Sequence, residues 1–222
     1  RVARTGFAAW DDAGWSRRVK AAARGGPAVM VTGRIDYVML GQLAIANHVS
    51  QASMMWQRTP KCIRRHPNPD FYLGYICEGS GRLRQNNNET QVSAGDMVIY
   101  DASSPFHFAM ENVSMNIIHL PRHLIEKEAP AIAAMSGTSL DLSRPGMVAL
   151  RHMIDEAFRF NAAEEGSCLT EQFANTLFTV ISVGLNLQKS DEGLKPTLYS
   201  RVMSYMRQHL QDHDLSVAQI AN

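Results

Sequence analysis

The sequence predicts an α+β protein in which one large β-unit is followed by helices. Residues 28–120 hold short runs rich in Val, Ile, Tyr and Met, separated by clusters of turn-forming residues, which is typical of an all-β unit. After Pro121 the apolar residues recur at helical spacing instead. With 222 residues, of which 45% are apolar, the chain is long enough to bury a large core.

A helix is expected before the β-unit. Residues Phe7–Arg24 follow a loosely amphipathic pattern, and Gly25-Gly26-Pro27 ends it. Each apolar run that follows has the length of a strand. We expect strands near Val29–Val31, Ile35–Leu40, Leu43–His48, Ser53–Arg58, Phe71–Cys77, Gly81–Gln85, Glu89–Val92, Met97–Tyr100, Phe106–Met110 and Met115–Leu120.

Turn-forming residues separate these strands. Asn86-Asn87-Asn88 suits a tight hairpin because asparagine tolerates positive φ. Ala94-Gly95-Asp96 and Ser103-Ser104-Pro105 predict two further turns, and Gly79-Ser80-Gly81 predicts a hairpin turn. The run Phe71–Cys77 is apolar on both faces, as happens when a sheet curls into a barrel or sandwich.

Helices are expected from Pro121 onward. Leu124–Met135 predicts one or two short helices, broken by Pro130. Ser143 can cap a helix with Pro145 in its first turn. The helices expected over 145–160 and 168–188 form an antiparallel hairpin, which we predict to carry a dimer surface. Its candidate residues are Leu150, Ile154, Phe158, Phe173, Leu177 and Ile181.

Charge and cysteine usage limit the classes of protein. Lys and Arg number 22 against 21 Asp and Glu, so the net charge of +1 excludes a chain that is basic throughout, but not a small DNA-binding module. Cys62, Cys77 and Cys168 show no CxxC spacing, which excludes a sequence-evident zinc site and suits a reducing cytosol. No apolar run approaches the ~20 residues that span a membrane. We expect a cytoplasmic protein.

A second domain is expected at the C-terminal end. Residues 189–196 are polar, contain Gly and end in Pro196, which predicts a linker between a first domain over 1–188 and a second one over 197–222. Ser216 and Gln219 have the spacing of a capping box, with apolar residues placed as a hydrophobic staple around them. A helix therefore begins there, and we expect its domain to continue past Asn222.

These residues resemble a known family. The stretch 201–210, followed by Leu215-Ser216-Val217 and Ile220-Ala221, resembles the start of the DNA-binding domain of AraC/XylS-family transcription regulators, where "V-x-x-Y-I-x-x-x-L" precedes "L-S-x-x-x-I-A". The β-unit resembles the sensor domain of the branch that governs catabolic operons, often for aromatic compounds. That resemblance rests on Gln57–Pro60, Phe71–Leu73, Gly79-x-Gly81, Gln85, Gly95–Asp101 and Pro105-Phe106-x-Phe108.

The resemblance implies a cupin-like β-barrel over Ala28–Leu120, dimerising helices after it, and the first helices of a helix-turn-helix domain. It also implies a ligand-responsive regulator of a catabolic operon that works as a homodimer, with promoter DNA bound by the domain continuing past Asn222. The effector would be a small aromatic molecule or an aromatic acid. Candidate effector-binding residues are Trp56, Arg58, Tyr72, Tyr75, Tyr100 and His107.

These candidates differ in what they offer a ligand. Arg58 lies at a strand end beside Trp56, where a guanidinium could pair a carboxylate bidentately. Strand alternation puts Tyr72 and Tyr75 on opposite faces, so at most one of them faces the interior. His107 points opposite to both of its Phe neighbours, and could contact a polar ligand or face solvent.

Two other functions remain open. Many cupin-like barrels are metal-dependent oxygenases or isomerases, but the hairpin Gly79–Val92, which matches the first metal motif, contains no histidine. His107 alone does not make a site, because a metal needs about three protein ligands. We therefore expect neither a bound metal or other cofactor nor catalysis. The second alternative is a dimerisation module whose barrel is filled solidly and takes no ligand.

Overall fold

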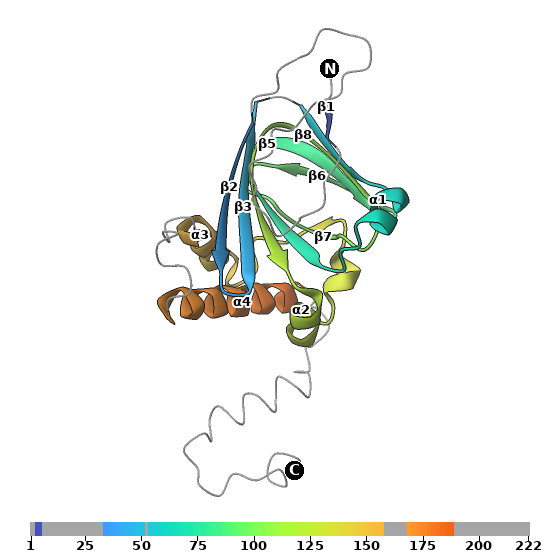
Figure 1. Ribbon diagram of the computed structural model, residues 1–222. Coiled ribbons are helices and arrows are strands. Elements are labelled where there is room, and N and C mark those ends of the chain that lie inside the picture. The colour runs from blue at the N-terminus through green and yellow to red at the C-terminus, as the bar shows by residue number, and fades with distance from the viewer. Residues whose placement is uncertain (1–2, 6–32, 52, 158–167, 189–222) are drawn as a thin grey trace, which may run out of the picture.

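The computed structural model describes residues 3–5, 33–51, 53–157 and 168–188, which form a curled sheet with helices packed against one side of it (Figure 1). The predicted helix Phe7–Arg24 and the strand Val29–Val31 lie outside these residues. So do Phe158, the linker 189–196 and the helix start at Ser216 and Gln219.

The described part has nine strands and five helical segments. The strands are β1 (Ala3–Thr5), β2 (Gly33–Leu40), β3 (Leu43–Ser50), β4 (Met54–Arg58), β5 (Phe71–Gln85), β6 (Asn88–Ser93), β7 (Met97–Asp101), β8 (Phe106–Leu120) and β9 (Thr138–Ser139). The helices are α1 (Pro60–Arg65), α2 (Arg122–Glu128), the 3-10 helix η1 (Ile132–Met135), α3 (Met147–Ala157) and α4 (Cys168–Leu187). None of the described helices is long and apolar enough to cross a membrane.

Two long strands, β5 and β8, curl the sheet. They pair antiparallel along almost their full length, from Phe71↔Leu120 to Gln85↔Phe106. The first half of β5 also pairs with β7 and its second half with β6, while β8 pairs with β4 in its first half and β3 in its second. Each long strand therefore belongs to both halves of the sheet, which fold over each other as a barrel (Figure 1).

The bend in β5 corrects one prediction. Gly79-Ser80-Gly81 is no hairpin turn: it lies inside β5, where the register with β8 shifts on both sides of Glu78. Gly79 has φ +89°, and a Cβ there would lie 2.3 Å from the carbonyl oxygen of Glu111. Glycine is needed because the two backbones approach closely at a bulge. The strands predicted on either side of this bend are consequently one strand, and so are the two predicted within β8.

The asparagine hairpin is confirmed. Asn86 and Asn87 connect β5 to β6 with φ values of 50° and 66°, the left-handed conformation that a two-residue hairpin loop requires. Two other elements differ from prediction. Residues 60–65 form α1, capped by the Thr59 side chain, which accepts a hydrogen bond from the Cys62 N–H. Ser143 does not cap α3, because it donates to Asp141 in a turn before the helix begins at Met147.

The sheet separates two buried cores. One lies between the halves of the barrel, because it contains side chains of both halves, including Tyr72, Val98, Leu83 and Phe106. The other lies between the sheet and the helices, and contains Phe71, Leu73 and Tyr75 of β5 together with residues of α2, α3 and α4. The alternation of β5 explains this division, since successive residues point to opposite faces.

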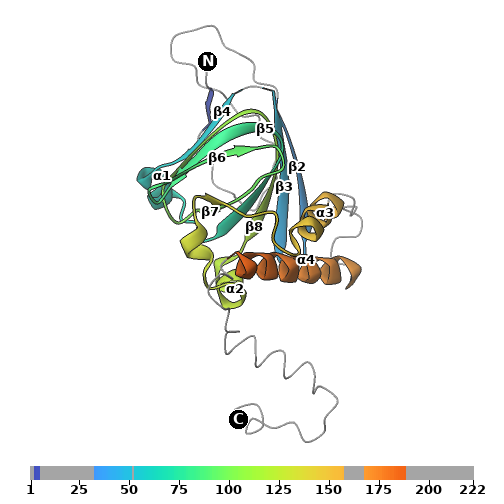
Figure 2. The same ribbon diagram turned by 180° about the vertical axis from the view of Figure 1, so that it is seen from behind.

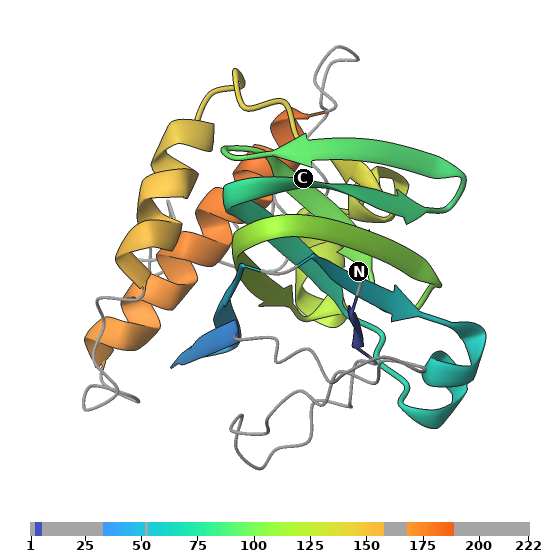
Figure 3. The ribbon, with the colours of Figure 1, turned by 90° about the horizontal axis from the view of Figure 1, so that it is seen from above.

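The helices α3 and α4 lie side by side along the barrel (Figures 2 and 3). Leu150 and Ile154 of α3, and Leu177 and Ile181 of α4, are fully buried in the core beneath them, and Phe173 is half-buried. These predicted dimer residues therefore pack inside the subunit, because an amphipathic helix turns its apolar face to its own sheet. The exposed apolar residues of this layer are Val148, Leu169 and Val183.

Candidate functional site

Aromatic side chains line the interior of the barrel. They come from four strands: Trp56 of β4, Tyr72 of β5, Tyr100 of β7, and Phe106 and Phe108 of β8. His48 of β3 extends this group at one end and His119 of β8 at the other. We call these seven rings the aromatic interior.

The rings of the aromatic interior form one connected series. Tyr72 and Tyr100 stack with an interplanar angle of 13°. The other contacts are tilted or edge-to-face, the geometries that aromatic pairs favour. The centroid distances are 5.4 Å for His119–Tyr72, 5.3 Å for Tyr72–Tyr100, 5.1 Å for Tyr100–Phe106, 6.0 Å for Tyr100–Phe108, 5.6 Å for Phe108–Trp56 and 5.1 Å for Trp56–His48.

Two polar groups of the aromatic interior are deeply buried. His48 is 6% exposed and Tyr100 is 3% exposed. Burial lowers the pKa of His48 to about 4, so its imidazole is neutral at pH 7. Burial, and then the neighbouring Tyr72, raise the pKa of Tyr100 well above 10, so its hydroxyl stays protonated.

Arg58, the predicted partner of a ligand carboxylate, is held in place by backbone carbonyl groups. The side chain is buried, and its Nε donates to the carbonyl oxygen of Ala102 at 2.5 Å. One terminal nitrogen donates to the carbonyl oxygen of His66 at 2.7 Å. The side chain therefore ties β4 to the segments that hold Ala102 and His66. These bonds use two of its five N–H donors, and both acceptors are neutral, so the guanidinium keeps its positive charge.

The structure separates the remaining candidates. Tyr72 faces the barrel interior, whereas Tyr75 faces the helices as part of the second core. His107 lies between Gln57 and Arg84 on the outer face of the barrel, opposite to the aromatic interior. Trp56, Tyr72 and Tyr100 are thus brought together, while Tyr75 and His107 are excluded from the interior.

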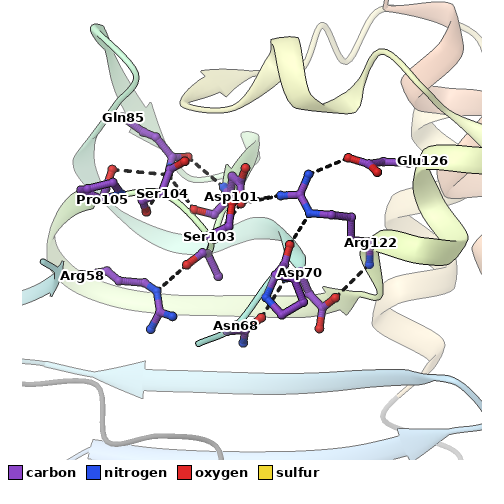
Figure 4. A network of polar contacts seen from close by, with 12 residues as sticks. Arg58, Asn68, Asp70, Gln85, Asp101, Ser103, Ser104, Pro105, Arg122 and Glu126 are labelled. Atoms are coloured by element: carbon purple, nitrogen blue, oxygen red, sulfur yellow. Dashed lines mark hydrogen bonds and ion pairs between the residues drawn. The ribbon is translucent and has the colours of Figure 1, made fainter. Parts of the chain in front are cut away.

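A network of polar contacts joins the aromatic interior to α2 (Figure 4). The carboxylate of Asp70 accepts from Nε2 of His119 at 2.8 Å and from the backbone N–H of Arg122 at 2.9 Å. The Arg122 guanidinium lies 2.7 Å from Oδ1 of Asp101 and 2.6 Å from Oε1 of Glu126, and it stacks on the Phe71 ring at 4.0 Å. We call this network the polar junction.

Two further side chains bond beside the polar junction. The Gln85 side-chain amide donates to the carbonyl oxygen of Asp101 at 2.7 Å and accepts from the N–H of Asp101 at 2.8 Å. It thus pairs with the Asp101 backbone as a residue of a neighbouring strand would. Asn68 donates to the Tyr72 hydroxyl at 2.8 Å. Burial opposes the charge of Arg122, but its hydrogen bonds to Asp101 and Glu126 outweigh this and raise its pKa.

Sequence reasoning missed most of these residues. Asp70 and Arg122 stand 52 positions apart, and neither belongs to a recognisable spacing. His48 and His119 stand alone in the sequence and belong to no motif. The one available signal was Gln85, which is among the residues that carry the family resemblance.

Two surface grooves lie on the barrel half formed by β4, β5, β6 and β8. One has a volume of about 680 Å³ and is lined by Gln57, Arg58, Arg84, Gln85, Phe106 and His107, among others, so it brings the candidates Arg58 and His107 together. The second, of about 470 Å³, is lined by Met55, Arg82, Gln91 and neighbouring residues. Arg82 and Arg84 both pair with Glu89, so this carboxylate offsets only one of the two positive charges. Across the described ranges, no three His, Cys, Asp or Glu residues cluster as metal ligands do.

The curled barrel with helices on one side defines a cupin-like α+β domain, as the sequence predicted. The chain belongs to the family of AraC-binding-like domains, whose model matches residues 19–180. This confirms the resemblance predicted from the β-unit. The expected helix-turn-helix start at Leu215–Ala221 lies outside both the matched and the described residues.

One solved structure supports the fold. The chain is similar to the AraC-like transcriptional activator CuxR, with 16% identity and a TM-score of 0.63 over 86% of this chain and 69% of that chain. It is also similar to an RmlC-like cupin protein from Desulfovibrio desulfuricans, with 12% identity and a TM-score of 0.33 over 48% of this chain and 95% of that chain. The likeness to CuxR shows a shared fold.

Proposed function

We propose that this chain is the effector-sensing part of a transcription regulator of a catabolic operon, and that a small aromatic effector binds in the aromatic interior. The observation that carries the proposal is the connected series of aromatic rings inside the barrel of an AraC-binding-like domain. Ligand sites are mostly apolar with a few well-placed polar groups. The protein would act in the cytoplasm and not as an enzyme.

The effector must favour one of two arrangements of the protein in order to act as a signal. The polar junction offers a physical route, because Asp70 contacts both His119 of the interior and the first residue of α2. At the other end of α2, the carbonyl oxygen of Glu128 accepts from the Asn186 side chain of α4 at 2.7 Å. A change at the aromatic interior would therefore reach α4 through direct contacts.

We also propose that α4 forms a homodimer with a second copy of the chain. Its outward residues Leu169, Gln172, Thr176, Thr179 and Val183 are exposed and follow the alternating three- and four-residue spacing of a helix–helix seam. None of them is charged. The Thr176 and Thr179 hydroxyls donate to the carbonyl oxygens of Gln172 and Asn175 on their own helix. Their polar groups are thereby satisfied within the helix, which suits a surface buried against a partner.

The domain division supports the same function. Residues 1–188 would sense the effector and dimerise, 189–196 would link, and 197–222 would begin the DNA-binding domain, which continues past Asn222 to reach promoter DNA. The support for this last part is the resemblance of the capping box at Ser216 and Gln219 to the start of a helix-turn-helix domain.

Transcript profiling tests the regulatory role. A strain lacking the gene and its parent would be grown with and without aromatic carbon sources. We expect a small set of catabolic transcripts to respond to the aromatic compound only in the parent strain. If the same transcripts respond equally in both strains under every condition, the regulatory role is wrong.

A further inference from the structure

We propose that the surface groove of about 680 Å³ binds an aromatic carboxylate, with its carboxylate group on Arg58 and its ring against Phe106. Both residues line this groove, which we call the arginine groove. The inference rests on the proposed effector role of the barrel. It names the chemical class of the effector and the cation that would hold it.

The arginine groove lies where three strands meet at their ends. β4 ends at Arg58, β5 ends at Gln85 and β8 begins at Phe106, and Phe106 is paired with both of the others. The lining therefore combines inward-facing residues, such as Phe106, with outward-facing ones, such as His107. Small-molecule sites in proteins have volumes of roughly 300–1,000 Å³, so a ligand of one ring and one acid group has room here.

The Arg58 guanidinium is a buried cation without a buried counter-charge. Its side chain is 8% exposed, and its hydrogen bonds go to the neutral carbonyl oxygens of Ala102 and His66. None of the ion pairs among the described residues includes it. The two bonds hold the guanidinium in position (Figure 4), and about three of its five N–H donors are left for a ligand. A carboxylate would supply the missing charge and match the planar guanidinium bidentately.

The charges around the arginine groove favour an anion. Its lining includes Arg58 and Arg84 as cations and Glu89 as an acid. Glu89 is already shared between Arg84 and Arg82, so it offsets neither arginine fully and is not paired with Arg58. Residues 58–66, which lead from the groove into α1, contain Lys and Arg side chains but no Asp or Glu. An acid entering the groove therefore meets a net positive charge, from which a neutral ligand gains nothing.

Phe106 offers the ligand an apolar surface. It lines the arginine groove, and its ring centroid lies 5.1 Å from that of Tyr100, so it joins the groove to the aromatic interior. An aromatic ring placed on Phe106 gains offset-stacked or edge-to-face contacts beyond the burial of its surface. A ligand held by Arg58 would thus contact the same series of rings to which we assign the effector.

The first test compares two acids with their amides: benzoate with benzamide, and phenylacetate with phenylacetamide. Each pair has the same ring and nearly the same shape but differs in charge. Titration calorimetry of the whole chain at pH 7, in 0.1 M salt without phosphate, measures the affinities. We expect an acid to bind at least about tenfold more tightly than its amide. Equal or tighter binding of the amides would overturn the acid preference and leave an aromatic effector in place. No binding by any of the four would overturn both proposals.

A variant of the arginine locates the binding. Arg58→Gln removes the positive charge but keeps a side-chain N–H for one of the two carbonyl oxygens. We expect it to weaken binding of the acid at least about tenfold and to leave binding of the amide unchanged, because a hydrogen bond to a charged group is lost. Arg64→Met is the matched control, since Arg64 is an exposed arginine of α1 outside the groove lining. It should keep the affinity for the acid within about twofold, because salt screens an exposed charge.

A second pair of variants tests the site if circular dichroism shows that Arg58→Gln does not fold. Gln57 is exposed and lines the arginine groove, whereas Gln91 is exposed and lines the other groove. We expect Gln57→Glu to weaken binding of the acid about 3- to 10-fold relative to Gln91→Glu, because it places a like charge beside the ligand. Equal affinities of these two variants for the acid, or full affinity of a folded Arg58→Gln protein, would exclude the arginine groove as the site.

Discussion

Replacing Arg122 with methionine tests whether the polar junction holds α2 on the barrel. The substitution keeps a long apolar stem over Phe71 but removes every bond of the guanidinium. The Arg122 side chain is 24% exposed and that of Asp101 10% exposed, so this ion pair is largely shielded from water. Glu126 is 41% exposed, and its pair with Arg122 contributes little.

The expected loss follows from these contacts. A hydrogen bond to a charged group contributes about 1.5–3 kcal/mol, and Asp101 keeps a second bond, from the Ser103 N–H, when Arg122 is lost. We therefore expect Arg122→Met to lower the free energy of unfolding by about 2–3 kcal/mol. For a chain of this length the melting temperature should fall by about 4–12 °C.

Urea unfolding followed by circular dichroism measures this loss, provided that the slope against urea is the same in both proteins. Arg84→Met is the matched control, because Arg84 pairs with Glu89 on the exposed outer face of the barrel. The control should unfold like the unaltered protein. If Arg122→Met destabilises the protein no more than Arg84→Met does, the polar junction does not hold α2 as described.

Three further predictions concern the barrel and the helices. The pKa of His48 falls from 6.5 to about 4 on folding, so the unfolded chain binds more protons than the folded chain between these pH values. The free energy of unfolding should therefore be highest above pH 6.5 and decline by about 3 kcal/mol as the pH falls to 4. A His48→Gln variant should lack this part of the acid dependence in urea titrations. Gly81→Ala should cost about 1–3 kcal/mol or more, because its Cβ would lie 2.3 Å from the Ala109 carbonyl oxygen, whereas Ser80→Ala should unfold normally. Thr176→Glu should raise the dissociation constant of the homodimer at least about tenfold in sedimentation equilibrium, because it places like charges in the proposed seam; an unchanged constant would exclude this face.

The order of the elements could be predicted because it depends on local patterns. Alternating runs located the strands, the asparagine hairpin joined β5 to β6, and four-residue apolar steps gave α4. The errors have local causes too. Gly79 was predicted to lie in a turn, because the sequence does not distinguish a glycine that a turn needs from one that a β-bulge needs. Leu177 was predicted to lie in a dimer surface, because the apolar face of a helix has the same pattern whether its own sheet or a second copy covers it.

The site was less predictable, because it depends on which distant residues meet. Alternation required Tyr72 and Tyr75 to face opposite sides, but only the position of the helices decided that Tyr72 faces the interior. A strand-end arginine was predicted to be available for a ligand, but not that Arg58 is also bonded to carbonyl oxygens 8 and 44 positions away. Contacts between residues so far apart in the chain produce no periodic pattern in the sequence.

By itself, then, the sequence determined the β-then-α order, the family and the supply of aromatic residues, because these follow from short-range patterns and motifs. The tertiary structure decided how those residues are used. It bent β5 and β8 so that both halves of the barrel share them, and it brought Asp70 to Arg122 across 52 positions. It also buried His48 and Tyr100 inside the barrel. Burial and pairing are properties of three-dimensional neighbours, and short-range patterns in a sequence do not determine them.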